Sequence, residues 1–332
     1  MKPAIALFLA LAAPAIAEEY PEFEVGWLMF GDLYHVPAHH LEKGEGATGA
    51  VIRRGYLTFD AQFNEAWEGR LRFELNQSGE FETYDFEVDV KDLYVARQLG
   101  QQELMIGLSP TVTYALIEGI WGLRYLMRTP MDLQGVASRD TGVKLGGPLN
   151  SSGSLNYSVM IGTGIEFGAE AGDGRKTMAS LSWQPAEGYF LEWYVDYEKL
   201  VGRTDRSTLQ FFAGHSSDAL RWGLQYSYQD RQDDPTLALA SGFIVRPVSP
   251  KWNAIGRIDR IMEPSPEGDN ISYIPFDPSA PATMFLAGFE YRAAEHFMIV
   301  PNGIVTTYDR DDEGIRPNTD VQLRLTFFLD FE

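Results

Sequence analysis

Few residues of this chain have side chains suited to covalent or metal chemistry. It has five histidines and no cysteine, which excludes thiolate metal sites and cysteine nucleophiles. His215-Ser216-Ser217-Asp218 holds the residue types of a serine hydrolase, but successive strand residues point to opposite faces, so a turn is the better interpretation. His35, His39 and His40 with Glu42 could hold a metal, although their spacing follows no fixed ligand pattern. We therefore expect no enzymatic activity, no cofactor and no bound metal.

Charged residues in the segment 110–138 suggest a different chemistry, the selection of ions. The segment is long and apolar for a solvated connection, and Tyr114 to Leu126 could form a short helix that Thr129-Pro130 would end. Arg124 and Arg128 are four apart and would share a face of that helix. Folded into a pore, the segment would place Glu118, Arg124 and Arg128 at a constriction, where charged side chains select ion sign. The alternative is an apolar lid packed against a wall, with its charges simply solvated.

The elements that would position such a segment alternate in hydrophobicity with a period of two. In Trp67 to Asn76, the apolar residues Trp67, Leu71 and Phe73 occupy one face and charged residues the other. Segments 189–198, 220–229 and 321–331 repeat the pattern, which predicts strands with one apolar and one polar face. A soluble sandwich alternates too. Strands of about ten residues, with aromatic residues at the ends of their apolar faces, are typical of membrane barrels.

The order of the connections decides the topology. The connections alternate between long or polar and short, as the external loops and periplasmic turns of outer-membrane barrels do. We predict an all-β, transmembrane antiparallel β-barrel of about 16 strands with the third external loop folded into the lumen, and fourteen or eighteen strands remain open. The strands are expected to start near Val25, Ile52, Trp67, Phe86, Glu103, Asp140, Leu155, Lys176, Tyr189, Ser207, Leu220, Leu237, Trp252, Thr283, Phe297 and Thr319.

Charge and the first residues bear on partners and location. The chain has 27 basic and 47 acidic residues, a formal charge of -20, which argues against a nucleic-acid partner. Lys2, the apolar run Ala4 to Ala13 and Ala15-Ile16-Ala17 predict a signal peptide over residues 1–17, followed by a barrel domain over 18–332. We expect a protein of the cell outer membrane that contacts its lipid and depends on the barrel-assembly machinery.

A barrel of sixteen strands encloses an aqueous lumen. Alternation assigns Arg54, Arg70, Arg72 and Arg324 to the pore lining. The first three could form one basic patch or could pair with Asp60, Glu68 and Glu74 across the wall. A wide polar tube predicts a porin for passive diffusion of small hydrophilic solutes or ions. The alternative is a barrel enzyme or adhesin without channel activity.

Several motifs between residues 50 and 147 resemble the phosphate-selective porin family and its uncharacterised porin relatives. They are Ile52-Arg53-Arg54-Gly55-Tyr56-Leu57, Val90-Lys91-Asp92-Leu93-Tyr94-Val95, Leu108-Ser109-Pro110, Ile117-Glu118-Gly119-Ile120-Trp121-Gly122, Arg128-Thr129-Pro130 and Ser138-Arg139-Asp140-Thr141-Gly142. The resemblance implies a sixteen-stranded barrel, usually a homotrimer, with the third loop in the pore and anions such as phosphate among its solutes.

Two features depart from that family's pattern. Phosphate-selective members carry a basic ladder along the pore, whereas the inward basic and acidic residues expected here are balanced. The final aromatic residue that the assembly machinery recognises is expected to be Phe331, one position before the terminal Glu332. The inward basic set is Arg54, Arg70, Arg72, Lys144, Arg221, Arg257, Arg292 and Arg324, and the acidic set is Asp60, Glu68, Glu74, Glu192, Asp196, Glu198, Asp259 and Glu290.

Overall fold

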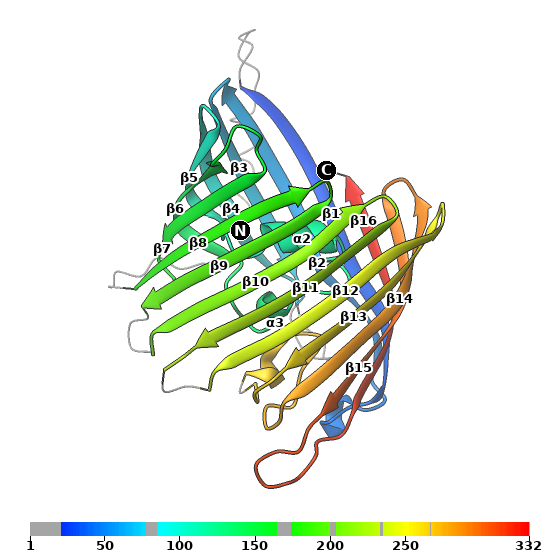
Figure 1. The fold of residues 1–332 in the computed structure, drawn as a ribbon. Helices are drawn as coiled ribbons and strands as arrows, with labels where there is room; N and C mark the ends of the chain where they lie inside the picture. Colours follow the sequence, from blue (N-terminus) through cyan, green and yellow to red (C-terminus); the bar gives the residue numbers. More distant parts are fainter. Residues whose placement is uncertain are drawn as a thin grey trace.

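Sixteen antiparallel strands make up most of the computed structural model, which describes residues 21–77, 85–164, 174–199, 204–232, 235–265 and 267–331 (Figure 1). The predicted signal peptide and Glu332 lie outside these residues. The strands are β1 (Glu22–Ala38), β2 (Thr48–Asn64), β3 (Trp67–Asn76), β4 (Glu87–Leu99), β5 (Gln102–Pro110), β6 (Arg139–Pro148), β7 (Leu155–Gly162), β8 (Arg175–Ala186), β9 (Tyr189–Lys199), β10 (Arg206–Ser217), β11 (Leu220–Asp230), β12 (Leu237–Ser249), β13 (Trp252–Ile261), β14 (Ala282–Ala294), β15 (Phe297–Tyr308) and β16 (Asp320–Phe331).

The strands close into a barrel in sequence order. Each pairs with its neighbours in the chain, and β1 pairs with β16 from Trp27 opposite Phe331 to Ala38 opposite Val321. Figure 1 shows this closure where the blue and red strands meet. Closure satisfies the backbone groups that an open sheet edge would leave unpaired. The predicted fold class and the count of sixteen are therefore confirmed.

The connections are sorted by length between the two ends of the barrel. Those after even-numbered strands span two residues, except for six at 149–154. Those after odd-numbered strands span six residues or more. Because the strands are antiparallel, they all leave from the opposite end. The long connections used below are L1 (39–47), L3 (111–138), L7 (262–281) and L8 (309–319). L1 holds the 3₁₀ helix η1 (Glu42–Gly44), and L7 holds η2 (Gly268–Asn270).

The wall carries apolar side chains outward and polar ones inward. On β9, Trp193 and Val195 are exposed, whereas the alternate residues Glu192 and Asp196 are buried. A soluble protein has the opposite arrangement, because it buries apolar surface and solvates charge. An apolar exterior around a polar interior is typical of transmembrane barrels.

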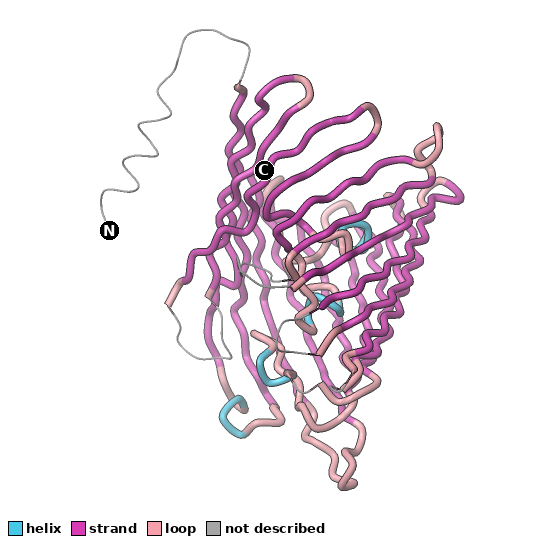
Figure 2. Tube along the Cα trace, turned by 90° about the vertical axis from the view of Figure 1, so that its left-hand side faces the viewer, coloured by secondary structure: helices cyan, strands magenta, loops and turns pink. Residues whose placement is uncertain are grey.

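L3 folds into the barrel, where its two helices lie (Figures 1 and 2). Helix α2 (Ala115–Trp121) ends at Gly122, whose φ of 64° favours glycine, and a Cβ there would lie 2.1 Å from Nη1 of Arg221. The prediction of one helix to Leu126 is wrong, since α2 already ends at Trp121. Pro130, which was expected to end that helix, instead begins the second helix, α3 (Pro130–Leu133). Arg124 and Arg128 lie between the helices and share no helix face. None of the described helices is long and apolar enough to cross a membrane.

Part of the inner wall is apolar, which differs from the predicted polar lining. Tyr114, Trp121, Leu126 and Met131 of L3 pack in one buried cluster with inward residues of β12–β15. Burying this surface favours the inward position of L3. The cluster residues of β12–β15 are Leu237, Leu239, Val245, Ile255, Ile261, Ala282, Met284, Leu286, Val300, Ile304 and Tyr308.

Two irregular pairings bring extra basic residues inside. Phe30 lies opposite Arg54 and Gly31 opposite Ile52, so Arg53 has no counterpart in β1. On β4, Lys91 is skipped in the same way between Val90 and Asp92. An extra residue reverses the alternation. Arg53 and Arg54 therefore both contact interior groups, as do Lys91 and Asp92.

Candidate channel constriction

The three charges predicted for the constriction lie together on L3. Nε of Arg124 is 3.0 Å from Oε1 of Glu118, and its Nη2 is 2.9 Å from Oδ2 of Asp132. Nη1 of Arg128 is 3.7 Å from Oδ1 of Asp132. Asp132, which the sequence did not single out, thus joins the two arginines after α2 has ended. Asp132 lies in α3, a helix that the sequence did not predict.

The electrostatics of these groups show crowding of positive charge. Burial opposes ionisation of Asp132, but Arg124 and Arg128, followed by Lys91 and Arg54, outweigh it and lower its pKa. Burial lowers the pKa of Arg128; Asp132 opposes this, while Arg54 and Arg124 add to the lowering. Wall and loop charges are therefore close enough to act on one another.

The facing wall supplies two further groups of ion pairs. Arg54 pairs with one oxygen of Glu74, and Nζ of Lys91 is 3.4 Å from the other. Arg139 and Arg72 approach the two oxygens of Asp92, with Nε atoms at 2.5 Å and 3.8 Å. We call these groups and the L3 charges the constriction cluster. Its members are the basic residues Arg54, Arg72, Lys91, Arg124, Arg128 and Arg139 and the acidic residues Glu74, Asp92, Glu118 and Asp132.

In most pairs of the constriction cluster the base is more exposed than the acid. The side chains of Arg124 and Arg128 are 25% exposed and that of Asp132 is 8% exposed. Arg54 is 22% exposed against 3% for Glu74. Glu118, at 23%, is almost as exposed as its partner Arg124 at 25%. Among the described residues the cluster has six bases and four acids, so its accessible charge is positive although the whole chain is strongly acidic.

The interpretation of Arg54, Arg70 and Arg72 as members of ion pairs is confirmed, with partners that differ in part from those expected. Nε of Arg70 is 2.7 Å from Oδ1 of Asp60, and the two side chains are about equally exposed. Arg72 approaches Asp92 rather than Glu68, and its Nε donates a 2.8 Å hydrogen bond to Thr58.

Arg324, which was predicted to line the pore, is buried in a group of charges with Asp32 and Arg53. Its Nη1 lies 3.4 Å from Oδ2 of Asp32, and Nε of Arg53 lies 2.8 Å from the same oxygen. Arg53 also donates hydrogen bonds to the carbonyl oxygens of Tyr125 and Leu126 in L3. Arg324 donates to the carbonyl oxygen of Tyr273 in L7. These buried charges hold two long connections rather than line open water.

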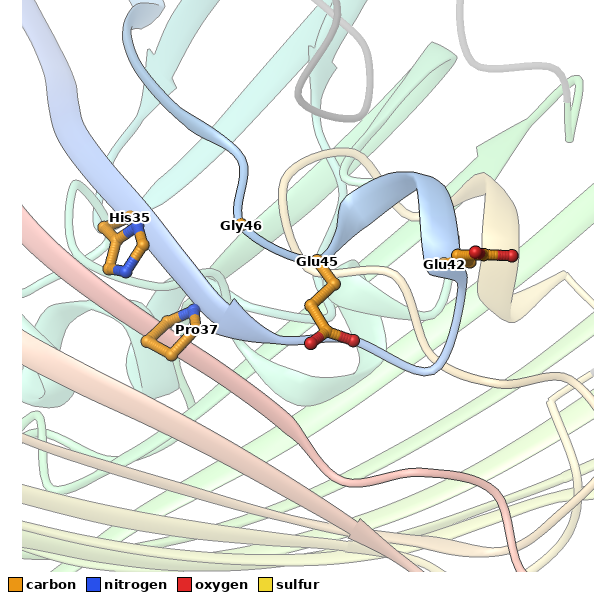
Figure 3. A pocket seen from close by; sticks show the side chains of 5 residues that line it. All are labelled: His35, Pro37, Glu42, Glu45 and Gly46. Carbon is orange, nitrogen blue, oxygen red and sulfur yellow. The ribbon is translucent and has the colours of Figure 1, made fainter.

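His35, His39, His40 and Glu42, the possible metal ligands in the sequence, do not gather into one site. L1 and the end of β1 line a pocket of about 550 Å³. Figure 3 shows His35 on β1 and Glu42 at opposite sides of the group of residues that line it. His35 pairs with Thr48 at 2.9 Å. His39 and His40 instead gather with Asp320. The prediction that His215-Ser216-Ser217-Asp218 forms a turn is wrong for its first three residues, because His215 to Ser217 end β10 and only Asp218 lies in the turn. Nε2 of His215 lies 3.1 Å from Oγ of Ser217, and its ring packs against that of Tyr189, with centroids 4.4 Å apart.

Comparisons with known proteins support the fold. No protein-family model matches the chain. No curated protein matches it either. Among solved structures, an anion-selective porin from Comamonas acidovorans is 10% identical, with a TM-score of 0.65 over 94% of this chain and 100% of that one. The outer membrane channel DcaP of Acinetobacter baumannii is 11% identical, with a TM-score of 0.67 over 96% and 100%. OmpT of Vibrio cholerae, an outer membrane protein in its trimer form, is 11% identical, with a TM-score of 0.64 over 94% and 100%.

These likenesses show that the chain has the barrel fold of outer-membrane porins. Because these proteins are only 10–11% identical to this chain, the likenesses establish the fold alone. The resemblance to the phosphate-selective family remains a prediction.

Proposed function

We propose that this protein is an outer-membrane porin through which small hydrophilic solutes diffuse passively, with a preference for anions. The observation that carries the preference is the depth of charge in the constriction cluster: the arginines reach accessible space, and most of their carboxylates are buried behind them. A charged ring lowers the barrier for ions of opposite sign. Water-filled, polar interiors are typical of barrels of this size.

The solute class follows from the same geometry. Phosphate is one of the anions that guanidinium groups bind. The arginines of the constriction cluster are already paired with carboxylates and form no continuous ladder, so a general anion preference fits better than phosphate specificity. The resemblance to phosphate-selective porins and the likeness to the anion-selective porin of Comamonas acidovorans both support this class of solute.

Location and assembly complete the proposal. The apolar exterior fits the outer membrane, reached by way of the predicted signal peptide and the barrel-assembly machinery. A homotrimer is supported by the trimer form named for one similar structure. Native mass spectrometry of the detergent-solubilised protein tests this assembly, and a purely monomeric species would contradict it.

A pair of arginine substitutions tests the selectivity. Arg124→Ala with Arg128→Ala would leave four basic and four acidic residues in the constriction cluster. We expect the permeability ratio of chloride to potassium in planar bilayers to fall by about a factor of two or more. The matched control, Arg310→Ala with Arg316→Ala, removes the same charge from exposed positions of L8 and should leave the ratio nearly unchanged. A reversal potential that responds equally to both pairs would contradict the constriction assignment.

A further inference from the structure

His40 of L1 lies between two carboxylates that come from distant parts of the chain. Its Nδ1 is 3.0 Å from both oxygens of Asp320, and its Nε2 is 3.1 Å from Oδ1 of Asp269. The His40 side chain is only 1% exposed. An ionised carboxylate can only accept hydrogen bonds, so both ring nitrogens must donate. The geometry therefore describes a doubly protonated, positively charged histidine.

The charged histidine joins three segments at the end of the barrel where the long connections lie. Asp269 belongs to η2 in L7, and Asp320 begins β16. The amide of His40 also donates to Oδ1 of Asp320 at 2.6 Å. The other titratable groups that face it are His39, stacked on it at 4.4 Å, Tyr308 of β15, which donates to Asp320, and Asp277 of L7. Three carboxylates thus surround one cation.

L7 is a second connection that reaches into the barrel. Ile271, Ile274 and Phe276 are buried in the same apolar cluster as L3. Oγ of Ser265 donates to Oε1 of Gln134 in L3 at 2.7 Å. The position of L7 therefore affects the space beside L3. The contact between His40 and Asp269 holds L7 at the end of the barrel where the long connections lie.

A metal ion is a weaker occupant for this cluster than a proton. Nitrogen and oxygen atoms of His39, His40 and Asp320 lie within 4.8 Å of one another. However, Nδ1 of His39 already accepts the amide hydrogen of Leu41 at 3.0 Å, which places the ring proton on Nε2. Both nitrogens of His40 face carboxylates as donors. Neither ring offers a free lone pair in this arrangement.

We propose that His40 is a proton-operated latch that holds L7 at the mouth of the barrel and releases it as the external pH rises. Burial lowers the pKa of His40, but the hydrogen bond and charge of Asp320, with Asp269, outweigh burial and raise the pKa above its usual value. A raised histidine pKa means that the latch is fully formed below about pH 6.5 and is lost as the pH rises through the folded value. The proposal concerns the motion of L7 and stands whether or not the barrel conducts.

A spin label on L7 tests the latch directly. The chain has no cysteine, so Asn270→Cys provides a single labelling site at an exposed residue next to Asp269. In the refolded full-length barrel, we expect the label spectrum to shift from immobile to mobile between about pH 5.5 and about pH 9. With His40→Gln it should be mobile at both values. His35→Gln, which changes an exposed histidine of β1, should behave as the parent.

Further measurements decide the remaining cases. If His40→Gln fails to refold, Asp269→Asn keeps the His40–Asp320 pair and removes only the L7 partner, and its label should be mobile at both pH values. A parent spectrum unchanged across the pH range would overturn the latch. So would an immobile label in Asp269→Asn at the higher pH. Immobilisation of the parent by added Zn²⁺ at high pH, lost in His40→Gln, would replace the proton with a metal and also overturn it.

Discussion

Glu118 is the carboxylate of L3 whose charge we expect to change with pH at the constriction. Burial raises its pKa, and Arg124 offsets part of this effect. It is also the acidic member of the constriction cluster that is about as exposed as its basic partner. Glu118 therefore opposes the arginines at neutral pH and stops doing so once it is protonated.

Lowering the pH should strengthen the anion preference. A carboxyl with a raised pKa gains its proton above the usual value of about 4.3, so the positive excess grows as the pH falls through that raised value. We expect the chloride-to-potassium permeability ratio to rise by about a factor of two. Glu118→Gln should show the higher ratio at neutral pH and lose this pH dependence. If the variant kept the parent's titration, another group would be responsible.

Individual residues show where prediction from the sequence ends. Alternation assigned Arg54, Arg70, Arg72 and Arg324 to the pore lining, because a strand residue two positions away returns to the same face. It could not show that Arg324 is buried against Asp32. Arg53 and Lys91 were missed, since each is the extra residue of an irregular pairing. Two adjacent charged residues within an alternating run, as in Arg53-Arg54 and Lys91-Asp92, are the available signal of such an irregularity.

At the scale of elements, L3 is fixed by the wall as much as by its own helices. Arg53 donates to two L3 carbonyl oxygens, and Nη1 of Arg257 donates to that of Arg128 at 2.7 Å. The ring of Tyr125 stacks on Phe328, with centroids 4.2 Å apart. Short helices are marginal alone, so these contacts and the apolar cluster must hold the segment.

Arg53→Ala should loosen L3. The change removes two hydrogen bonds and one partner of the buried Asp32, at a cost on the order of 3 kcal/mol. We expect larger current noise and new tryptic cleavage after Arg124 and Arg128, detected by mass spectrometry of the peptides. Arg97→Ala removes an arginine that lies over the ring of Trp67, near a short turn, and should leave L3 protected. Equal protection in both variants would show that Arg53 does not anchor the loop.

The sequence contains a sign that the inner face of β12–β15 is apolar, although the period-two pattern alone does not reveal it. Leu237 to Val245 is apolar at many positions of both faces, with Leu237 and Leu239 inward and Ala238, Ala240 and Ile244 outward. A strand apolar on both faces is covered on both. The pattern could have indicated that something packs inside this wall, but not that L7 joins L3 there. That depends on contacts between distant residues.

For the whole molecule, the barrel was predictable because its rules are global. Strand length, alternation and the sorting of connections all point to one closed sheet. The proposed preference for anions was not predictable, because the inward charges are balanced in number. It rests on the depth of these charges: Glu74 and Asp92 are buried, whereas Arg54 and Arg139 are more exposed. The number of charged residues in the sequence does not show which of them are buried.

The reversal potential of the unmodified protein tests whether the barrel is an anion-preferring channel. Pure refolded barrel is added to a planar bilayer that separates two KCl concentrations. We expect stepwise current increases and a reversal potential whose sign corresponds to chloride passing more readily than potassium. Stepwise currents with the opposite sign would contradict the anion preference, and the absence of any step would contradict the channel itself.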